Sequence, residues 1–134
     1  MYRGTSGTPF ITIRKIFHES LKHYKLPQAY VKYLKGVGYN FKDIQNAIKR
    51  GTPLVLSMAN DGRDYYTNHS ITIIGYDIYK INGKEVKMIA VYDNWYAVVS
   101  YVDYDKISKI SSIHYPDITA SQRFDMWRLL KNLK

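Results

Sequence analysis

The stretch that decides the fold is residues 69–92, which reads HSITIIGYDIYKINGKEVKMIAVY. β-Branched and aromatic residues dominate both of its ends, as is typical of strands. Asn82-Gly83 lies between them, and this dipeptide is the strongest short-range signal for a two-residue hairpin turn. The stretch therefore predicts two antiparallel strands, His69–Tyr79 and Met88–Tyr92, that pair across the turn.

Further strands are expected on both sides of this hairpin. Pro53–Ala59 is a short apolar run typical of a buried strand, and Val98–Val102 predicts a third strand after Tyr92. Beyond Pro116 the apolar residues return to a helical period, which predicts an amphipathic helix over residues 120–133. The residues on its apolar face are Phe124, Trp127, Leu130 and Leu133.

The first 50 residues follow a helical period. Thr8-Pro9 is typical of a helix start, and the apolar stripe behind it is Phe10, Ile13, Phe17, Leu21 and Tyr24. A second short helix is expected from Pro27 to the glycines at 36 and 38, with Tyr30, Tyr33, Leu34 and Val37 on one face.

Asn40 with Asp43 three residues later resembles the capping pair of a third helix, with Asp in place of the usual Glu. Its buried face is predicted to be Phe41, Ile44, Ala47 and Ile48. The order is then a helical part at 8–50, an antiparallel sheet part at 53–115 and a helix at 120–133. Helices that precede an antiparallel sheet predict an α+β fold, here a single domain over residues 1–134.

Composition excludes several classes of protein. The chain has 134 residues, 46% of them hydrophobic, which is ordinary for a globular domain. No window approaches a membrane span, and no apolar region follows the first seven residues as a secretory signal would require. The net charge of +9 comes from scattered lysines, without any nucleic-acid-binding signature, so a solvated basic surface is expected. The chain has no cysteine, which excludes disulfides, thiolate metal sites and a thiol nucleophile.

His18 and His23 resemble a zinc-binding pair at first sight. Two ligands on one helical face must be four residues apart, whereas these are five apart and diverge by about 140°. We therefore expect neither a metal site nor a cofactor, and we read this helix as solvent-facing.

His69 and Asp93 are the residues that we expect to carry chemistry. His69 begins one predicted strand and Asp93 follows the next, so the two lie at the same edge of an antiparallel sheet. An imidazole and a carboxylate there can form a general base and the group that orients it. The alternative interpretation is that His69 is a hydrogen-bonded edge residue and that Asp93-Asn94 makes a turn.

Three segments in order, Ile44–Leu56, His69–Asp77 and Tyr92–Trp95, resemble the C-terminal half of a papain-like cysteine peptidase, and most closely the bacterial C39-like peptidases. The resemblance covers about residues 40–105. It implies a papain-like half-fold, with His69 as the general base and Asp93 as its orienting residue, or Asn94 as the alternative. Trp95 would shield the pair from water.

The chain departs from that family in its nucleophile. The family's cysteine lies near the start of a helix well before the histidine, with a glutamine shortly before it. Here the only serines before Ser57 are Ser6 and Ser20, and neither has a glutamine a few residues before it. We therefore expect the complete enzyme to hydrolyse peptide bonds, and this isolated chain to be inactive. The alternative is a non-catalytic binding module with a basic, tyrosine-rich surface. The resemblance also implies a secreted or cell-envelope setting in bacteria.

Two structural expectations follow. A turn centred on Asn82-Gly83 pairs residues whose numbers sum to 165, which places Asp93 about 10 Å along the strand from His69 unless a bulge intervenes. A missing nucleophile helix would also leave one sheet face apolar and uncovered. The candidates to cover it are the N-terminal helix around Phe10–Phe17, the terminal helix around Phe124–Leu133 and a second copy of the chain. We expect a homo-oligomer, with the N-terminal helix as the alternative.

Overall fold

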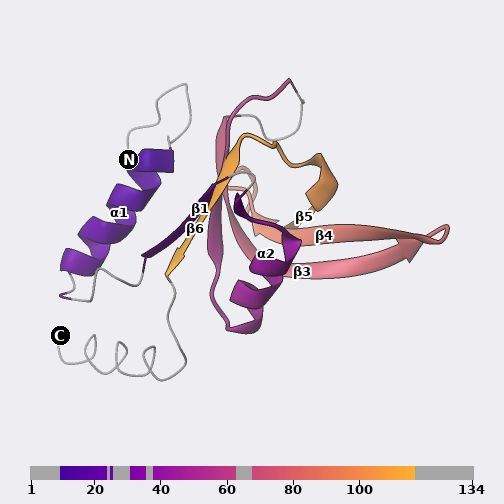
Figure 1. Cartoon of the computed structure of the whole chain (residues 1–134), viewed down its shortest axis with the longest axis horizontal. Coiled ribbons are helices and arrows are strands. Elements are labelled where there is room, and N and C mark those ends of the chain that lie inside the picture. Colours follow the sequence, from indigo (N-terminus) through magenta and orange to yellow (C-terminus); the bar gives the residue numbers. More distant parts are fainter. Residues whose placement is uncertain (1–9, 24, 26–30, 36–37, 63–67, 117–134) are drawn as a thin grey trace.

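The computed structural model describes residues 10–23, 25, 31–35, 38–62 and 68–116 (Figure 1). These residues form two α-helices and a six-stranded sheet, so the fold is α+β. The elements are α1 (Phe10–His23), β1 (Val31–Lys35), α2 (Phe41–Lys49), β2 (Leu54–Met58), β3 (His69–Ile81), β4 (Lys84–Tyr92), β5 (Ser100–Asp103), the short 3-10 helix η3 (Tyr104–Lys106) and β6 (Ser111–Pro116). Neither α-helix in this part of the chain is long and apolar enough to span a membrane.

The sheet has the strand order β1-β6-β2-β3-β4-β5, and every neighbouring pair is antiparallel. The hairpin of β3 and β4 projects from the rest of the sheet, with its tip at the predicted Asn82-Gly83 turn (Figure 1). Both turn residues have the positive φ that such a turn requires, 50° at Asn82 and 76° at Gly83.

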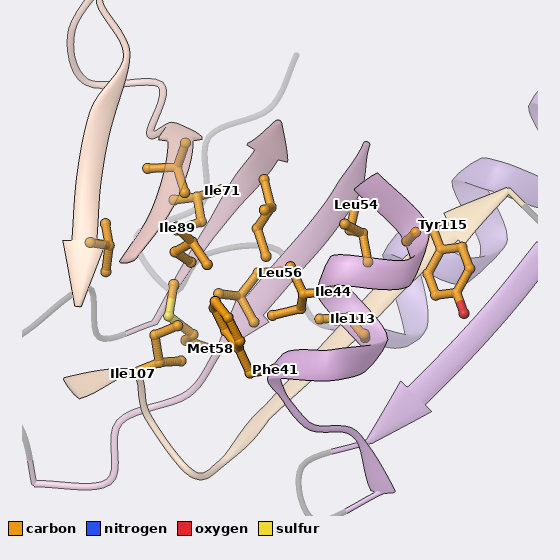
Figure 2. Packing of buried hydrophobic residues seen from close by; sticks show 14 residues of the cluster. Phe41, Ile44, Leu54, Leu56, Met58, Ile71, Ile89, Ile107, Ile113 and Tyr115 are labelled. Carbon is orange, nitrogen blue, oxygen red and sulfur yellow. The ribbon is translucent and has the colours of Figure 1, made fainter. Parts of the chain in front are cut away.

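The main hydrophobic core lies between α2 and one face of the sheet (Figure 2). The helix contributes Phe41, Ile44 and Ala47, as its apolar spacing predicts, and its start is the predicted capping box of Asn40 and Asp43. The residues on the sheet side alternate along their strands and include Leu54, Leu56, Met58, Ile71, Ile73, Ile89, Val91 and Ile113.

The opposite face of the sheet is polar near its centre. Ser57 pairs with Ser70 on one side and with Ser112 on the other, which forms a row of serines across β3, β2 and β6. Helix α1 packs against β1 and β6, on the other side of the sheet from α2 (Figure 1). The N-terminal helix thus covers part of the second face, which is the alternative given to an oligomer. A homo-oligomer remains a prediction.

The prediction of a short helix from Pro27 is wrong, because Val31–Lys35 forms strand β1. In a segment this short, helical and strand periods cannot be separated, and Val31 and Tyr33 are good strand residues. Pairing decides the outcome, since β1 aligns with β6 over its whole length, from Val31 opposite Pro116 to Lys35 opposite Ser112. The helical part at 8–50 is therefore interrupted by a strand.

Other boundaries differ slightly from expectation. The strand expected at Val98–Val102 is β5, Ser100–Asp103, and the sheet also includes β6 up to Pro116. The helix predicted at 120–133 and the Thr8-Pro9 start of the first helix lie outside the described residues.

A β-bulge in β3 changes the hairpin register. From the turn to Gly75, which pairs with Ala90, paired residue numbers sum to 165, but Ile73 pairs with Val91 and Thr72 with Tyr92. Ile74 is therefore the extra residue of the bulge. Because directly opposed residues share a face, the bulge places the start of β3, including His69, on the same face as the end of β4.

Burial of His114 on β6 makes the fold sensitive to acid. The imidazole has no exposed surface, and burial together with the positive charge of Arg14 lowers the pKa of His114 from 6.5 to about 4. His114 therefore binds a proton near pH 6.5 in the unfolded chain, but only near pH 4 in the folded chain. The contribution of His114 to the free energy of unfolding is fully present above pH 6.5 and is lost as the pH falls from there toward 4.

We expect this linkage to remove about 2 kcal/mol of the free energy of unfolding between pH 7.5 and pH 5. Urea unfolding at both pH values measures it. His114→Gln should flatten the pH dependence, whereas His23→Gln, at an exposed position on α1, should not. An unchanged slope in His114→Gln would show that another group causes the effect.

Candidate functional site

His69 lies at the start of β3, and its imidazole ring has one contact at the ring edge and another at the ring face. Its Nε2 lies 2.5 Å from the main-chain oxygen of Asp93. Its ring stacks on the indole of Trp95, with centroids 4.4 Å apart and planes 19° apart. Because a carbonyl oxygen only accepts hydrogen bonds, Nε2 carries the proton in the neutral ring, and Nδ1 holds the lone pair. The arrangement thus defines which nitrogen can act as a base.

The carboxylate of Asp93 organises the turn that follows β4. Its Oδ1 accepts hydrogen bonds from the backbone N–H groups of Trp95 (3.0 Å) and Tyr96 (3.2 Å), and its Oδ2 accepts one from Ser100 Oγ (3.3 Å). Asp93 is only 2% exposed. An aspartate that bonds to the backbone two and three residues ahead is a typical turn former. Here it fixes Trp95 beside the imidazole.

Two asparagines in the left-handed region flank the site. Asn94 has φ 64° and Asn68, directly before His69, has φ 51°. Asparagine tolerates this conformation better than most residues. The φ of Asn94 helps to set the orientation of the Asp93 carbonyl, and its Nδ2 donates to Ser70 O at 3.4 Å. Asn68 Oδ1 accepts from the N–H of Asn60 at 3.2 Å.

The structure brings His69, Asp93, Asn94 and Trp95 together at one edge of the sheet. The sequence left open whether Asp93 contacts His69 or forms a turn, and the structure shows both. The side chain of Asp93 forms the turn, and its main-chain oxygen bonds to His69. The expected approach of the Asp93 carboxylate to the imidazole stays a prediction. His18 and His23 both lie on α1, and no three described His, Asp or Glu side chains gather into a set that could hold a metal ion.

Sequence reasoning missed Ser100, Asn68 and Ser70 at this site. Ser100 is the first residue of β5 and reaches back to Asp93 from seven residues away. No local pattern marks such a partner. Asn68 could have been found, because an asparagine between a polar loop and a strand is a common signal for a left-handed turn residue.

The chain was compared with models of protein families and with curated proteins. The model of a protein family described as the Peptidase_C39 like family matches residues 2–120. The match includes the whole site and extends beyond residues 40–105 in both directions. No curated protein matches the chain.

Proposed function

Because the chain belongs to the Peptidase_C39 like family, we propose that it is a peptidase-type domain of papain-like fold that retains a general base and its orienting group without a thiol nucleophile. The position of His69 carries the proposal, since Nε2 is tied to Asp93 and the ring is stacked on Trp95. A ring held in this way presents one defined nitrogen for proton transfer.

In a complete enzyme of this type, the reaction is peptide-bond hydrolysis through an acyl-thioester. Nδ1 of His69 takes the proton of the attacking thiol, and the imidazolium later gives that proton to the leaving amine. Trp95 covers one face of the ring and limits the access of water to it. The Asp93 carbonyl keeps the proton on Nε2 throughout, so Nδ1 alone exchanges protons with the reactants.

This chain has no cysteine, so we expect the purified protein neither to hydrolyse peptides nor to react with a thiol-directed inhibitor. A fluorescence-quenched peptide library measures the first property, and mass spectrometry after treatment with the inhibitor measures the second. His69→Ala serves as the control and should give the same background rate.

Turnover by the wild-type chain that disappears in His69→Ala would contradict the proposal. It would show that a hydroxyl group or a water molecule replaces the thiol. In that case His69 would have a complete catalytic role in this chain alone.

A further inference from the structure

An exposed apolar loop leads away from the site. Five large apolar side chains between residues 95 and 101 are open to solvent: Trp95 is 60% exposed, Tyr96 70%, Val98 60%, Val99 38% and Tyr101 57%. Single exposed apolar residues are normal, but a continuous run is not, because it leaves a hydrophobic patch in water. We call residues 95–101 the apolar loop. Its composition indicates a surface that a partner covers.

The apolar loop is continuous with the site at one end and with the sheet edge at the other. It begins at Trp95, whose ring stacks on His69, and its backbone is fixed by the Asp93 carboxylate at Trp95 and Tyr96. It ends in β5, which pairs only with β4 among the described strands and so forms one edge of the sheet. An edge strand offers backbone groups to an additional extended chain.

The distribution of charge distinguishes two candidate partners of the apolar loop, which are a second copy of the chain and a peptide. Residues 92–102 contain no lysine or arginine, and their one acidic residue, Asp93, is buried, although the chain as a whole carries +9. The nearest charged residues along the chain are Asp103 at the end of β5, which is half-buried, and Asp105 and Lys106, which are exposed. The apolar loop itself is thus uncharged on a basic protein. A second copy would bring two bodies of +9 together, whereas an apolar peptide with acidic flanks meets an uncharged surface and is attracted by the net charge.

We propose that the apolar loop binds an extended peptide that carries large apolar side chains flanked by acidic residues, with its backbone along the edge of β5. The inference rests on the proposed function, because it assigns the substrate class of the site that His69 belongs to. Apolar side chains of the peptide contact Tyr96, Val98 and Tyr101. The peptide backbone then passes Trp95 and reaches the imidazole.

The test uses two labelled ten-residue peptides with glutamates at both ends, one with leucines at its centre and one with serines in their place. Fluorescence anisotropy measures their binding to the full chain. Tyr96→Ser combined with Val98→Ser should weaken binding of the leucine peptide about tenfold or more. The matched control combines Ile81→Ser with Ile110→Ser, which are 56% and 57% exposed outside the apolar loop, and should change binding less than about twofold.

Equal binding of the two peptides, or equal weakening by both double variants, would overturn the inference. So would light scattering that shows an oligomer of the wild-type chain and a monomer of the Tyr96→Ser, Val98→Ser variant, since a second copy would then cover the loop. The assay involves no turnover. Its failure therefore leaves the base geometry of His69 intact, whereas hydrolysis by the wild-type chain would contradict the proposed function and leave the docking surface in place.

Discussion

Replacement of Asp93 by alanine should lower the free energy of unfolding by about 3 kcal/mol, because it removes a buried carboxyl group that accepts three hydrogen bonds. The backbone N–H groups of Trp95 and Tyr96 lose their partner, and so does the hydroxyl of Ser100. Urea unfolding measures the loss. Asp103→Ala is the matched control: that aspartate also accepts a backbone N–H, from Asp105 at 3.0 Å, but it is half-buried and should cost only about 1 kcal/mol.

The same variant separates the two functions of Asp93. Alanine keeps the main-chain oxygen that accepts from His69 Nε2, so any effect on the imidazole must act through the loosened turn. Two-bond ¹H–¹⁵N correlation spectra distinguish the neutral tautomers of histidine. We expect the Nε2–H form in the wild-type chain and a mixture of tautomers in Asp93→Ala. A pure Nε2–H form in the variant would show that the carbonyl is held in place without the carboxylate.

The sheet could be predicted where the sequence carries its own turn and period. The Asn82-Gly83 turn, the short apolar run of β2 and the spacing of Phe41, Ile44 and Ala47 are local signals, which the folded structure keeps. Strand β1 could not be predicted in the same way. Its conformation depends on pairing with β6, about 80 residues later in the chain, and no pattern within five residues reports such a partner.

The sequence indicates which residues lie at the candidate site. It does not indicate which atoms of those residues contact one another. The order of the strands indicates that His69 and Asp93 share an edge. Which atom of Asp93 meets the imidazole depends on the φ of Asn94 and on the hydrogen bond from Ser100, neither of which the sequence determines locally. The bulge at Ile74 is equally hidden, because Ile73 and Ile74 are chemically identical and either could face the core.

The bulge itself can be tested through these two isoleucines. In a regular hairpin whose paired numbers sum to 165, Ile74 would oppose Val91 and be buried, whereas the structure places Ile73 there, with no exposed surface, and leaves Ile74 half-buried. Ile73→Ala should therefore cost about 4 kcal/mol of the free energy of unfolding, and Ile74→Ala only about 1 kcal/mol. Ile78→Ala, in the same strand but 41% exposed, is the control and should cost less than about 1 kcal/mol.

The reverse order, with Ile74 the more costly, would mean that β3 pairs with β4 without a bulge. Because side chains alternate between the two faces, that register would turn His69 to the face opposite Asp93 and Trp95. The imidazole could then neither stack on the indole nor bond to the Asp93 carbonyl. The two alanine substitutions, at buried Ile73 and at half-buried Ile74, thus test the register on which the contacts of His69 with Asp93 and Trp95 depend.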